Sequence, residues 1–467
     1  MSVHNLFINL TFFALILFVS CANQGESPMS FTGAEGEVKI ITLDPGHFHA
    51  SLVQKVMYDQ VSPVVSVYAP DGLDVKDHLN RIRGFNTREH DPTHWQEKVY
   101  TGDDFLETMV KERIGNIVVI SGNNRVKTEY IKWAVEAGLH VLADKPMCIK
   151  KKGFELLREA FVSAERKHVL LYDIMTERYE VTTILQKRLA NNPDVFGVLQ
   201  EGTPDNPSIT KESVHHFFKY VSGNPVKRPA WYFDTNQQGE GLVDVSTHLV
   251  DLVQWTCFPE QIIDYSQDVQ MIHARRWATL ITKQQFEKVT RLSEFPDFLK
   301  SKLNSDGVLP VYANGEMTYK IKNIHARVSV IWNFQSSEGG GDIHYSSMRG
   351  TRTNILIRQG KKEKYRPELY VQVADRKFRE SVEKALKKAV SDLQGTYPGL
   401  KLEKVGNEWH VLIPDEYRVG HEAHFGQVME KYLQFLIDGK LPEWEIPNMI
   451  AKYYITTLAL EMALQTQ

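Results

Sequence analysis

The feature that most constrains the fold is a regular alternation of short apolar runs and amphipathic helical segments between residues 38 and 173. One of these runs, Asn116–Ser121, is almost purely apolar, as expected for a strand whose sheet is covered on both faces. The alternation predicts βαβ units and a doubly wound parallel sheet, an α/β Rossmann fold whose ligands bind at the carboxyl ends of the strands. The predicted strands are Val38–Leu43, Val64–Tyr68, Asn116–Ser121, His140–Ala143 and Val169–Asp173.

The pattern changes after about residue 175. A helix is predicted over Val181–Leu189, and β-rich segments follow it, including the long run Ile321–Phe334. The Asn-Gly pair at 314–315 predicts a hairpin turn. A charged amphipathic helix is predicted over Arg379–Leu393, and the C-terminal residues are expected to be helical. We therefore predict an α+β domain with a large open, mostly antiparallel sheet, closed by C-terminal helices.

The first 21 residues have the features of an export signal. Residues 6–19 form an apolar run too short to span a bilayer but suited to a signal peptide. Ser20 before Cys21 resembles a bacterial lipobox, which would make Cys21 the lipidated first residue of the mature chain. Residues 22–37 are small and polar and are predicted to form a linker. We expect an exported protein, periplasmic or lipid-anchored to the outer membrane, with plain secretion and a cytoplasmic location as the alternatives.

Charge and cysteine content narrow the choice of partners. The net charge of −3 argues against nucleic acid as a partner. The three cysteines, Cys21, Cys148 and Cys257, show no metal-ligand spacing and cannot make a disulfide framework. Given the export signal, a lipid at Cys21 is the only contact with a membrane that we expect.

The turn after the first strand reads LDPGHFHAS, and a helix is predicted from about Ser51 with Val53 and Val56 on its inner face. Gly46 permits close approach of a ligand to the backbone, and a helix N-terminus offers free N–H groups to a phosphate. His47 and His49 alternate, so on extended backbone they could share one face. The turn can be a nucleotide loop, a metal site or neither. Because the sequence shows no third convergent ligand, we expect no metal.

Two further clusters can carry chemistry. Lys145 follows the strand His140–Ala143, and Pro146 keeps it out of the helical region, so its side chain can project into the ligand crevice. The alternative is a surface lysine before a turn. Asp244 and His248 are four residues apart on a predicted helix, a spacing at which a carboxylate can orient an imidazole that acts as a general base. The alternative is an aspartate at the helix start beside a structural histidine.

These clusters together resemble the glucose–fructose oxidoreductase / inositol dehydrogenase (Gfo/Idh/MocA) family. The segment AGLHVLADKPM is similar to its Glu-Lys-Pro motif, with Asp144 in place of Glu, and GEGLVDVSTHLVD is similar to its Asp-x-x-x-His motif. The resemblance implies a Rossmann domain over residues 38–174 and a substrate domain over 175–467. Residues 362–415 look like an insertion that blocks or rebuilds the sheet surface through which family members pair as homo-oligomers.

The resemblance also implies roles for individual residues. Lys145 would hold the substrate hydroxyl and the nicotinamide in register, His248 would take the hydroxyl proton, and Asp244 would orient His248. The implied cofactor is NAD, with NADP as the alternative. It would contact Gly46, His47, His49, Lys145 and two further residues: Asp71, placed to bond the adenosine ribose, and Asn123, which lines the cofactor pocket.

The sequence departs from the family at the phosphate loop. The Gly-x-Gly-x-x-Gly fingerprint is missing, and Asp44-Pro45-Gly46-His47-Phe48-His49 stands in its place. We interpret this segment as a modified dinucleotide loop in which Gly46 and the helix N-terminus still face the pyrophosphate. Val126 stands about where the family has a histidine. A last group of polar and aromatic residues could lie near the substrate or on an ordinary surface, and we expect the two locations about equally. The group is His215, His216, Trp231, Tyr232, Arg275, Arg276 and Trp277.

Three functions are compatible with these observations. The first is a nicotinamide-dependent oxidoreductase acting on a hydroxyl of a sugar or sugar derivative, with a tightly bound cofactor, because an exported protein meets little free dinucleotide. The second is an NAD-dependent enzyme that cleaves glycosides by oxidation, elimination and reduction. The third is a non-catalytic, lipid-anchored sugar-binding protein.

Overall fold

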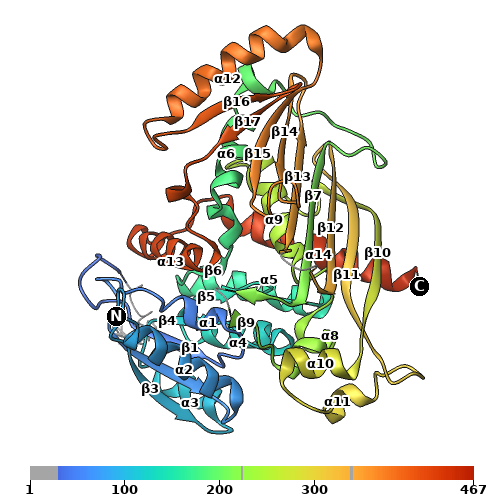
Figure 1. Ribbon diagram of the computed structural model, residues 1–467. Coiled ribbons are helices and arrows are strands. Elements are labelled where there is room, and N and C mark those ends of the chain that lie inside the picture. Colours follow the sequence, from blue (N-terminus) through green and yellow to red (C-terminus); the bar gives the residue numbers. More distant parts are fainter. Residues whose placement is uncertain (1–29, 222–223, 337–339, 467) are drawn as a thin grey trace, which may run out of the picture.

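The alternating segments form a parallel sheet of six strands in the computed structural model, which describes residues 30–221, 224–336 and 340–466 (Figure 1). The strand order is β3-β2-β1-β4-β5-β6, and the order reverses between β1 and β4, where a ligand crevice is expected. The predicted doubly wound α/β fold is thus confirmed. The strands are β1 (Ile40–Leu43), β2 (Val64–Ala69), β3 (Gln96–Thr101), β4 (Ile117–Ile120), β5 (His140–Asp144) and β6 (Leu171–Ile174).

The helices around this sheet differ from the prediction in two places. The sequence analysis did not identify α2 or the edge strand β3, both of which lie between β2 and α3. The helix after β1 is also shorter than predicted: α1 ends at Leu52, the Tyr58 hydroxyl donates to the carbonyl of Val53 at 3.0 Å, and Val56 is exposed. The five helices are α1 (His49–Leu52), α2 (Leu73–Thr87), α3 (Phe105–Glu112), α4 (Asn124–Glu136) and α5 (Lys151–Lys167).

The second sheet has nine strands in the order β10-β11-β12-β7-β13-β14-β15-β17-β16. All neighbouring pairs are antiparallel except β12 and β7, which run parallel, so the prediction of an open, mostly antiparallel sheet is confirmed. The strands are β7 (Ile209–Phe218), β10 (Val269–Ile281), β11 (Leu309–Ile321), β12 (Ile324–Gln335), β13 (Ile343–Arg349), β14 (Thr353–Arg358), β15 (Glu368–Val373), β16 (Lys401–Val405) and β17 (Glu408–Leu412). A separate short pair is formed by β8 (Tyr220–Val221) and β9 (Asn224–Pro225).

In this region the structure shows how the expected insertion folds and contradicts one predicted turn. Residues 362–415 extend the sheet by the three strands β15, β17 and β16, and α12 (Arg379–Leu393) packs with them around a third hydrophobic core. The hairpin turn predicted at Asn314-Gly315 is wrong, because both residues lie inside β11 and pair with β10, and Gly315 also pairs with β12.

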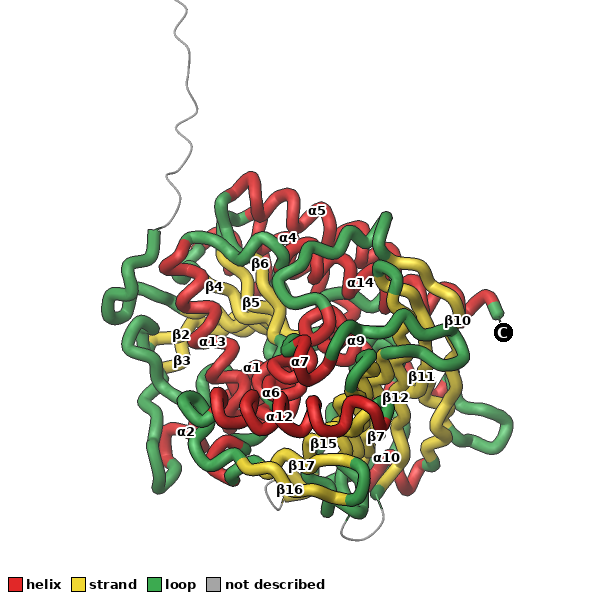
Figure 2. The backbone as a smooth tube through the Cα atoms, turned by 90° about the horizontal axis from the view of Figure 1, so that it is seen from above, coloured by secondary structure: helices red, strands yellow, loops and turns green. Residues whose placement is uncertain are grey.

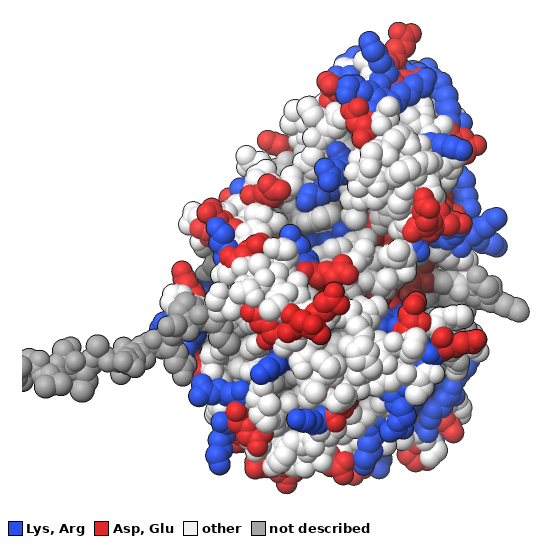
Figure 3. All heavy atoms as spheres, turned by 90° about the vertical axis from the view of Figure 1, so that its left-hand side faces the viewer, with Lys and Arg blue, Asp and Glu red and all other residues white. Residues whose placement is uncertain are grey.

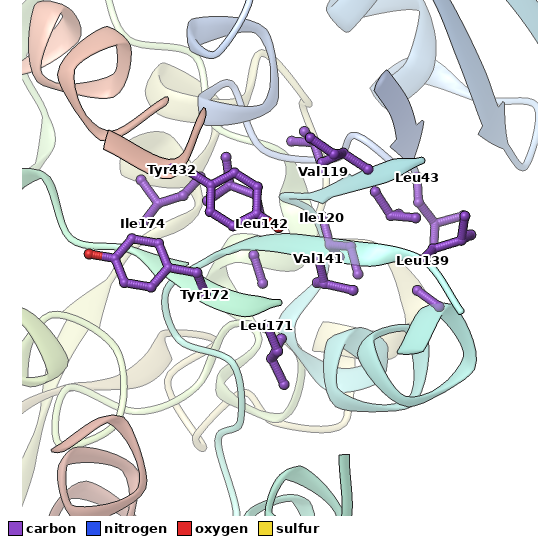
Figure 4. Packing of buried hydrophobic residues seen from close by; sticks show 14 of the residues in the cluster. Leu43, Val119, Ile120, Leu139, Val141, Leu142, Leu171, Tyr172, Ile174 and Tyr432 are labelled. Atoms are coloured by element: carbon purple, nitrogen blue, oxygen red, sulfur yellow. The ribbon is translucent and has the colours of Figure 1, made fainter. Parts of the chain in front are cut away.

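Of the two C-terminal helices, α13 (His421–Asp438) packs against the parallel sheet and α14 (Glu445–Gln465) against the second sheet, although both follow the second sheet in sequence. Helix α13 contributes to the core of the parallel sheet, and Tyr432 stacks on Tyr172 of β6 with 6.0 Å between ring centroids (Figure 4). Helix α14 runs behind the second sheet and contacts β10 and α9 (Figures 1 and 2). The remaining helices are α6 (Val181–Ala190), α7 (Pro193–Phe196), α8 (Thr235–Gln238), α9 (Ser246–Cys257), α10 (Lys283–Thr290) and α11 (Asp297–Lys300).

The expected signal peptide, the lipidation site at Cys21 and the first part of the expected linker lie outside the described residues. The described end of that linker is folded, because the Glu37 carboxylate accepts hydrogen bonds from the N–H groups of Thr32 and Gly33, and Phe31 is buried against His140. None of the helices in the described part combines the length and apolarity needed to cross a bilayer. On the face seen in Figure 3, acidic and basic side chains are interspersed.

Candidate active site

The candidate site lies at the carboxyl edge of the parallel sheet, where the loops after β1, β4 and β5 face the segment before α9. Lys145 follows β5 directly, and its Nζ donates to Oδ1 of Asp244 at 2.7 Å. The amide of Gln238 donates to the other oxygen, Oδ2, at 3.1 Å. Both members of the ion pair are largely buried. The structure therefore contradicts the alternative of a surface lysine and brings together two of the predicted catalytic residues.

The protonation state of Asp244 follows from these contacts. Burial acts to raise the pKa of its carboxyl group, but the charge of Lys145 and the hydrogen bonds from Lys145 and Gln238 outweigh burial and hold the pKa below its usual value. Asp244 is therefore an anion that keeps the Lys145 ammonium group in place.

The predicted bond between Asp244 and His248 is wrong. Asp244 lies in a turn before α9 rather than on the helix, and no hydrogen bond joins it to His248, although both residues are described. The Nδ1 atom of His248 is buried without a hydrogen-bond partner. Burial, with the charge of Lys145, lowers the pKa of His248 to about 3, so its ring is neutral near pH 7.

The two histidines of the β1 turn meet the residue before Lys145. His49 Nδ1 lies 3.0 Å from Oδ2 of Asp144, and His47 Nδ1 lies 3.7 Å from the same oxygen. Burial lowers the pKa of His49 to about 4. The ligand atoms of all three residues lie within 4.8 Å of one another. The structure thus supplies a third convergent ligand, Asp144. The sequence pattern did not reveal this ligand, and we expected no metal for that reason.

The backbone of the β1 turn differs from the expected phosphate loop. The N–H of Gly46 donates to the carbonyl of Asp44 at 2.8 Å, and the N–H of His47 donates to the carbonyl of Ser121 at 3.1 Å. Helix α1 is only four residues long. The expectation that Gly46 and the helix N-terminus face a pyrophosphate is therefore not met, because these first two N–H groups already have partners within the chain.

A cavity of about 590 Å³ opens beside this turn, which is ample for a small-molecule ligand. Its wall includes Gly46, His47, Trp231 and Tyr232. Five basic side chains also line it: Arg81, Arg125, Lys227, Arg228 and Arg291. The sequence analysis missed Arg81 because it lies on α2, a helix that was not predicted.

Of the six predicted cofactor residues, Gly46 and His47 line this cavity, whereas His49, Lys145, Asp71 and Asn123 do not. Asp71 is largely exposed and pairs with Lys76 at 3.1 Å. Its place at the cavity is taken by Asp74, which accepts a hydrogen bond from the Trp231 indole at 2.9 Å and whose pKa is raised by burial. Asn123 caps α4 and donates to Gln237 at 2.7 Å. The expected roles of Asp71 and Asn123 at the cofactor therefore have no support from their positions.

The other polar residues singled out by the sequence form ion pairs. His215 and His216 both lie beside the carboxylate of Asp342, at 3.3 and 3.1 Å. Arg276 pairs with Glu240 through two hydrogen bonds of 2.6 and 2.8 Å. The sequence analysis missed one pair, in which His421 Nδ1 lies 3.4 Å from the carboxylate of Glu177. The ring centroid of His421 lies 5.5 Å from that of His49.

Comparison with known proteins places the chain among oxidoreductases by sequence and by fold. Residues 185–464 match the family described as "Putative oxidoreductase C terminal domain". A solved protein from Parabacteroides merdae, described as a putative oxidoreductase, is 56% identical; the match covers 94% of this chain and 100% of that one, with a TM-score of 0.92. None of the curated proteins matches the chain.

More distant structures share the fold. Levoglucosan dehydrogenase, solved in complex with NADH, is 12% identical with a TM-score of 0.57, and the match covers 92% of this chain and 97% of that one. GenD2 from gentamicin A biosynthesis, solved in complex with NAD, is 14% identical with a TM-score of 0.54, and the match covers 95% of this chain and 98% of that one. At these identities the likeness shows the fold alone.

Proposed function

The chain belongs to the oxidoreductase C-terminal domain family, and from this premise we propose that it is a nicotinamide-dependent oxidoreductase acting on a hydroxyl group of a sugar or sugar derivative. The observation that carries the proposal is the buried pair Lys145–Asp244 beside the neutral imidazole of His248, at the edge of the sheet where ligands of this fold bind. The structural relatives solved with NADH or NAD support the choice of cofactor.

The cavity beside the β1 turn fits a dinucleotide through side chains rather than through backbone N–H groups. The guanidinium groups of Arg81 and Arg125 suit the charge of a pyrophosphate, and the carboxylate of Asp74 is a hydrogen-bond acceptor for ribose hydroxyl groups. When bound, NAD would supply the hydride acceptor for alcohol oxidation and the donor for the reverse reaction.

The residues of the chain then have separate tasks. The ammonium group of Lys145, held by Asp244, donates a hydrogen bond to the substrate hydroxyl oxygen and stabilises the negative charge that develops on it. The ring of His248, whose Nδ1 has no hydrogen-bond partner among the described residues, accepts the hydroxyl proton as the C–H bond is broken. Asp244 acts by holding Lys145 rather than by orienting His248.

The variant Lys145→Ala tests this assignment. Because the ammonium group contacts the reacting oxygen, we expect turnover of sugars with added NAD to fall by about 10²-fold or more, as when a single charge-stabilising donor is removed. Binding of NAD, followed by calorimetry, should persist. The control is Lys150→Ala, five residues away on the surface, whose ammonium group donates to the Asn236 side chain at 3.2 Å.

The outcomes separate the three candidate functions. Unchanged turnover in Lys145→Ala would remove this lysine from the mechanism. Absence of turnover and of NAD binding in the unaltered protein would favour a sugar-binding protein. Incorporation of solvent deuterium next to the oxidised carbon, with cleavage of a glycoside, would instead indicate the oxidation–elimination route.

A further inference from the structure

The side chains of His47, His49 and Asp144 converge on one point in the loop after β1. Two imidazole Nδ1 atoms approach the same carboxylate oxygen, Oδ2 of Asp144, at 3.7 and 3.0 Å. We propose that these three residues form a binding site for a divalent transition-metal cation such as Zn²⁺. This site goes beyond the proposed oxidoreductase function and does not depend on it.

The distances between the donor atoms suit a tetrahedral ion. With metal–ligand bonds of about 2.0–2.1 Å, the ligand atoms of a tetrahedral zinc site are roughly 3.3 Å apart. The separations of 3.0 and 3.7 Å lie on either side of that value, and the three ligand atoms fall within 4.8 Å of one another. The two nitrogen–oxygen separations therefore need to change by only a few tenths of an ångström on binding.

The kind and number of donors also indicate the class of ion. Two imidazole nitrogens and one carboxylate oxygen suit zinc and other first-row transition metals better than Mg²⁺ or Ca²⁺, which prefer oxygen ligands. Three protein ligands leave one position of a tetrahedral ion open, as in catalytic rather than structural zinc sites. His47 lines the cavity, so an ion held here would be reached from it.

The groups around the cluster hold its ligands in place. Ser121 Oγ donates to Oδ2 of Asp144 at 3.0 Å, and the ring of Phe425 lies 4.6 Å from the ring of His49. Such outer contacts orient metal ligands and contribute to affinity. The hydrogen bond between His49 Nδ1 and Asp144 would be replaced by bonds from both atoms to the ion, which requires the neutral imidazole to carry its proton on Nε2.

Two cationic groups lie close to the cluster and work against a bound cation. Lys127 Nζ donates to the backbone carbonyl of Asp144 at 2.9 Å, and Lys145 is paired with the Asp244 carboxylate. The ion pair of Lys145 offsets its charge locally, and Asp144 supplies an anionic ligand. We therefore expect 1:1 binding that is weaker than in a structural zinc site.

The three ligands coincide with the positions at which the sequence departs from the family it resembles. His47 and His49 stand in the segment that replaces the Gly-rich fingerprint, and Asp144 stands where the Glu-Lys-Pro motif has Glu. These positions are about a hundred residues apart in sequence, and the carboxyl ends of β1 and β5 bring them together. One metal site would account for all three departures.

The test is a titration of the purified full-length protein, freed of metal by a chelator, with Zn²⁺ alone in a calorimeter. We expect saturable binding of one ion per chain, and a visible absorption band typical of tetrahedral Co²⁺ when cobalt is used instead. The variants His49→Ala and Asp144→Asn should each bind Zn²⁺ at least about 10-fold more weakly, since even outer-shell changes cost that much. The matched control is His94→Ala, at an exposed histidine far from the cluster.

Either of two results would overturn the proposal: no saturable binding by the unaltered protein, or binding that both variants leave unchanged, which would mean an adventitious ion only. If a variant fails to fold, as judged by circular dichroism, His47→Gln is titrated in its place, because His47 is the most exposed of the three ligands. The titration contains no nicotinamide and no sugar, so its result is separate from success or failure of the proposed oxidoreductase activity.

Discussion

Burial and hydrogen-bond partners together decide whether a single side chain carries a charge, in the candidate active site as in the core. Asp244 stays ionised because Lys145 and Gln238 bond to it, whereas His248 has no such partner at Nδ1 and stays neutral. His78 on α2 is an extreme case, since both of its ring nitrogens are buried and unpartnered and burial lowers its pKa to about 3. Residues of this kind link protonation to stability.

We predict that His78 makes the protein less stable in acid. The folded-state pKa lies below the ordinary value of 6.5, so between pH 6.5 and 3 the unfolded chain binds a proton that the folded chain does not, and stability falls as pH falls. At pH 5 the loss from this residue is about 2 kcal/mol.

The variant His78→Leu checks this prediction. Leucine continues the apolar stripe of Val75 and Ile82 and removes the titrating group. The loss of unfolding free energy between pH 7 and pH 5, measured by urea denaturation, should be about 2 kcal/mol smaller than in the unaltered protein. His94→Leu serves as the exposed control. An equal loss in His78→Leu would show that His78 is protonated in the folded state.

Strand β11 shows how an element can override its local sequence signal. Asn314 sits opposite an irregularity in the pairing of β10 between Trp277 and Thr279. Its amide donates to the Trp277 carbonyl at 3.0 Å and accepts from the Trp332 N–H at 2.7 Å. Gly315 is needed because a Cβ there would lie 2.5 Å from Leu242. The Asn-Gly pair therefore accommodates the irregularity in β10 and the close approach of Leu242, and it does not form a turn.

We predict that Asn314→Ala lowers the free energy of unfolding by about 2–4 kcal/mol, because it leaves the Trp277 carbonyl and the Trp332 N–H buried without their partner. Thermal and urea unfolding measure the loss. Asn354→Ala in β14 is the control, since Asn354 is half-buried and its amide makes a single 3.3 Å bond to Gln372. A similar small loss in both variants would contradict the structural role of Asn314.

At the scale of the whole molecule, a buried network of charges ties α9 and α14 to the parallel sheet. Lys452 of α14 bonds to Asp173 of β6 at 2.6 Å and to Asp251 of α9 at 2.9 Å. Arg178 joins Asp251 to Glu445 at the start of α14. The network fixes α14, and with it α9 and the active-site turn before it, relative to the parallel sheet.

We predict that Lys452→Met costs about 3–5 kcal/mol of unfolding free energy, because it leaves Asp173 and Asp251 short of a buried counter-charge. The matched control is Lys151→Met, whose pair with Glu461 also joins α14 to its surroundings but is exposed and should be worth less than about 1 kcal/mol. Chemical denaturation of both variants gives the comparison. Equal effects would mean that burial of the network contributes nothing.

The sequence by itself determined the fold class, the resemblance to oxidoreductases and several residues at the edge of the sheet. Apolar runs alternating with amphipathic helices specify a doubly wound sheet through local periodicity, and Lys145, Asp244 and His248 were found because they lie in short ordered motifs. Their catalytic roles stay predictions, as do the lipid anchor and the sugar substrate.

Only the tertiary structure decided which of these residues touch. Asp244 bonds to Lys145 across 99 positions rather than to His248 four residues on, and Asp144 joins two histidines 95 and 97 positions before it. Asp74 rather than Asp71 faces the cavity, because α2 orients its first turn toward Trp231. Periodicity records which face of an element is buried, but partners at long range are set by how the two sheets pack, which no local pattern encodes.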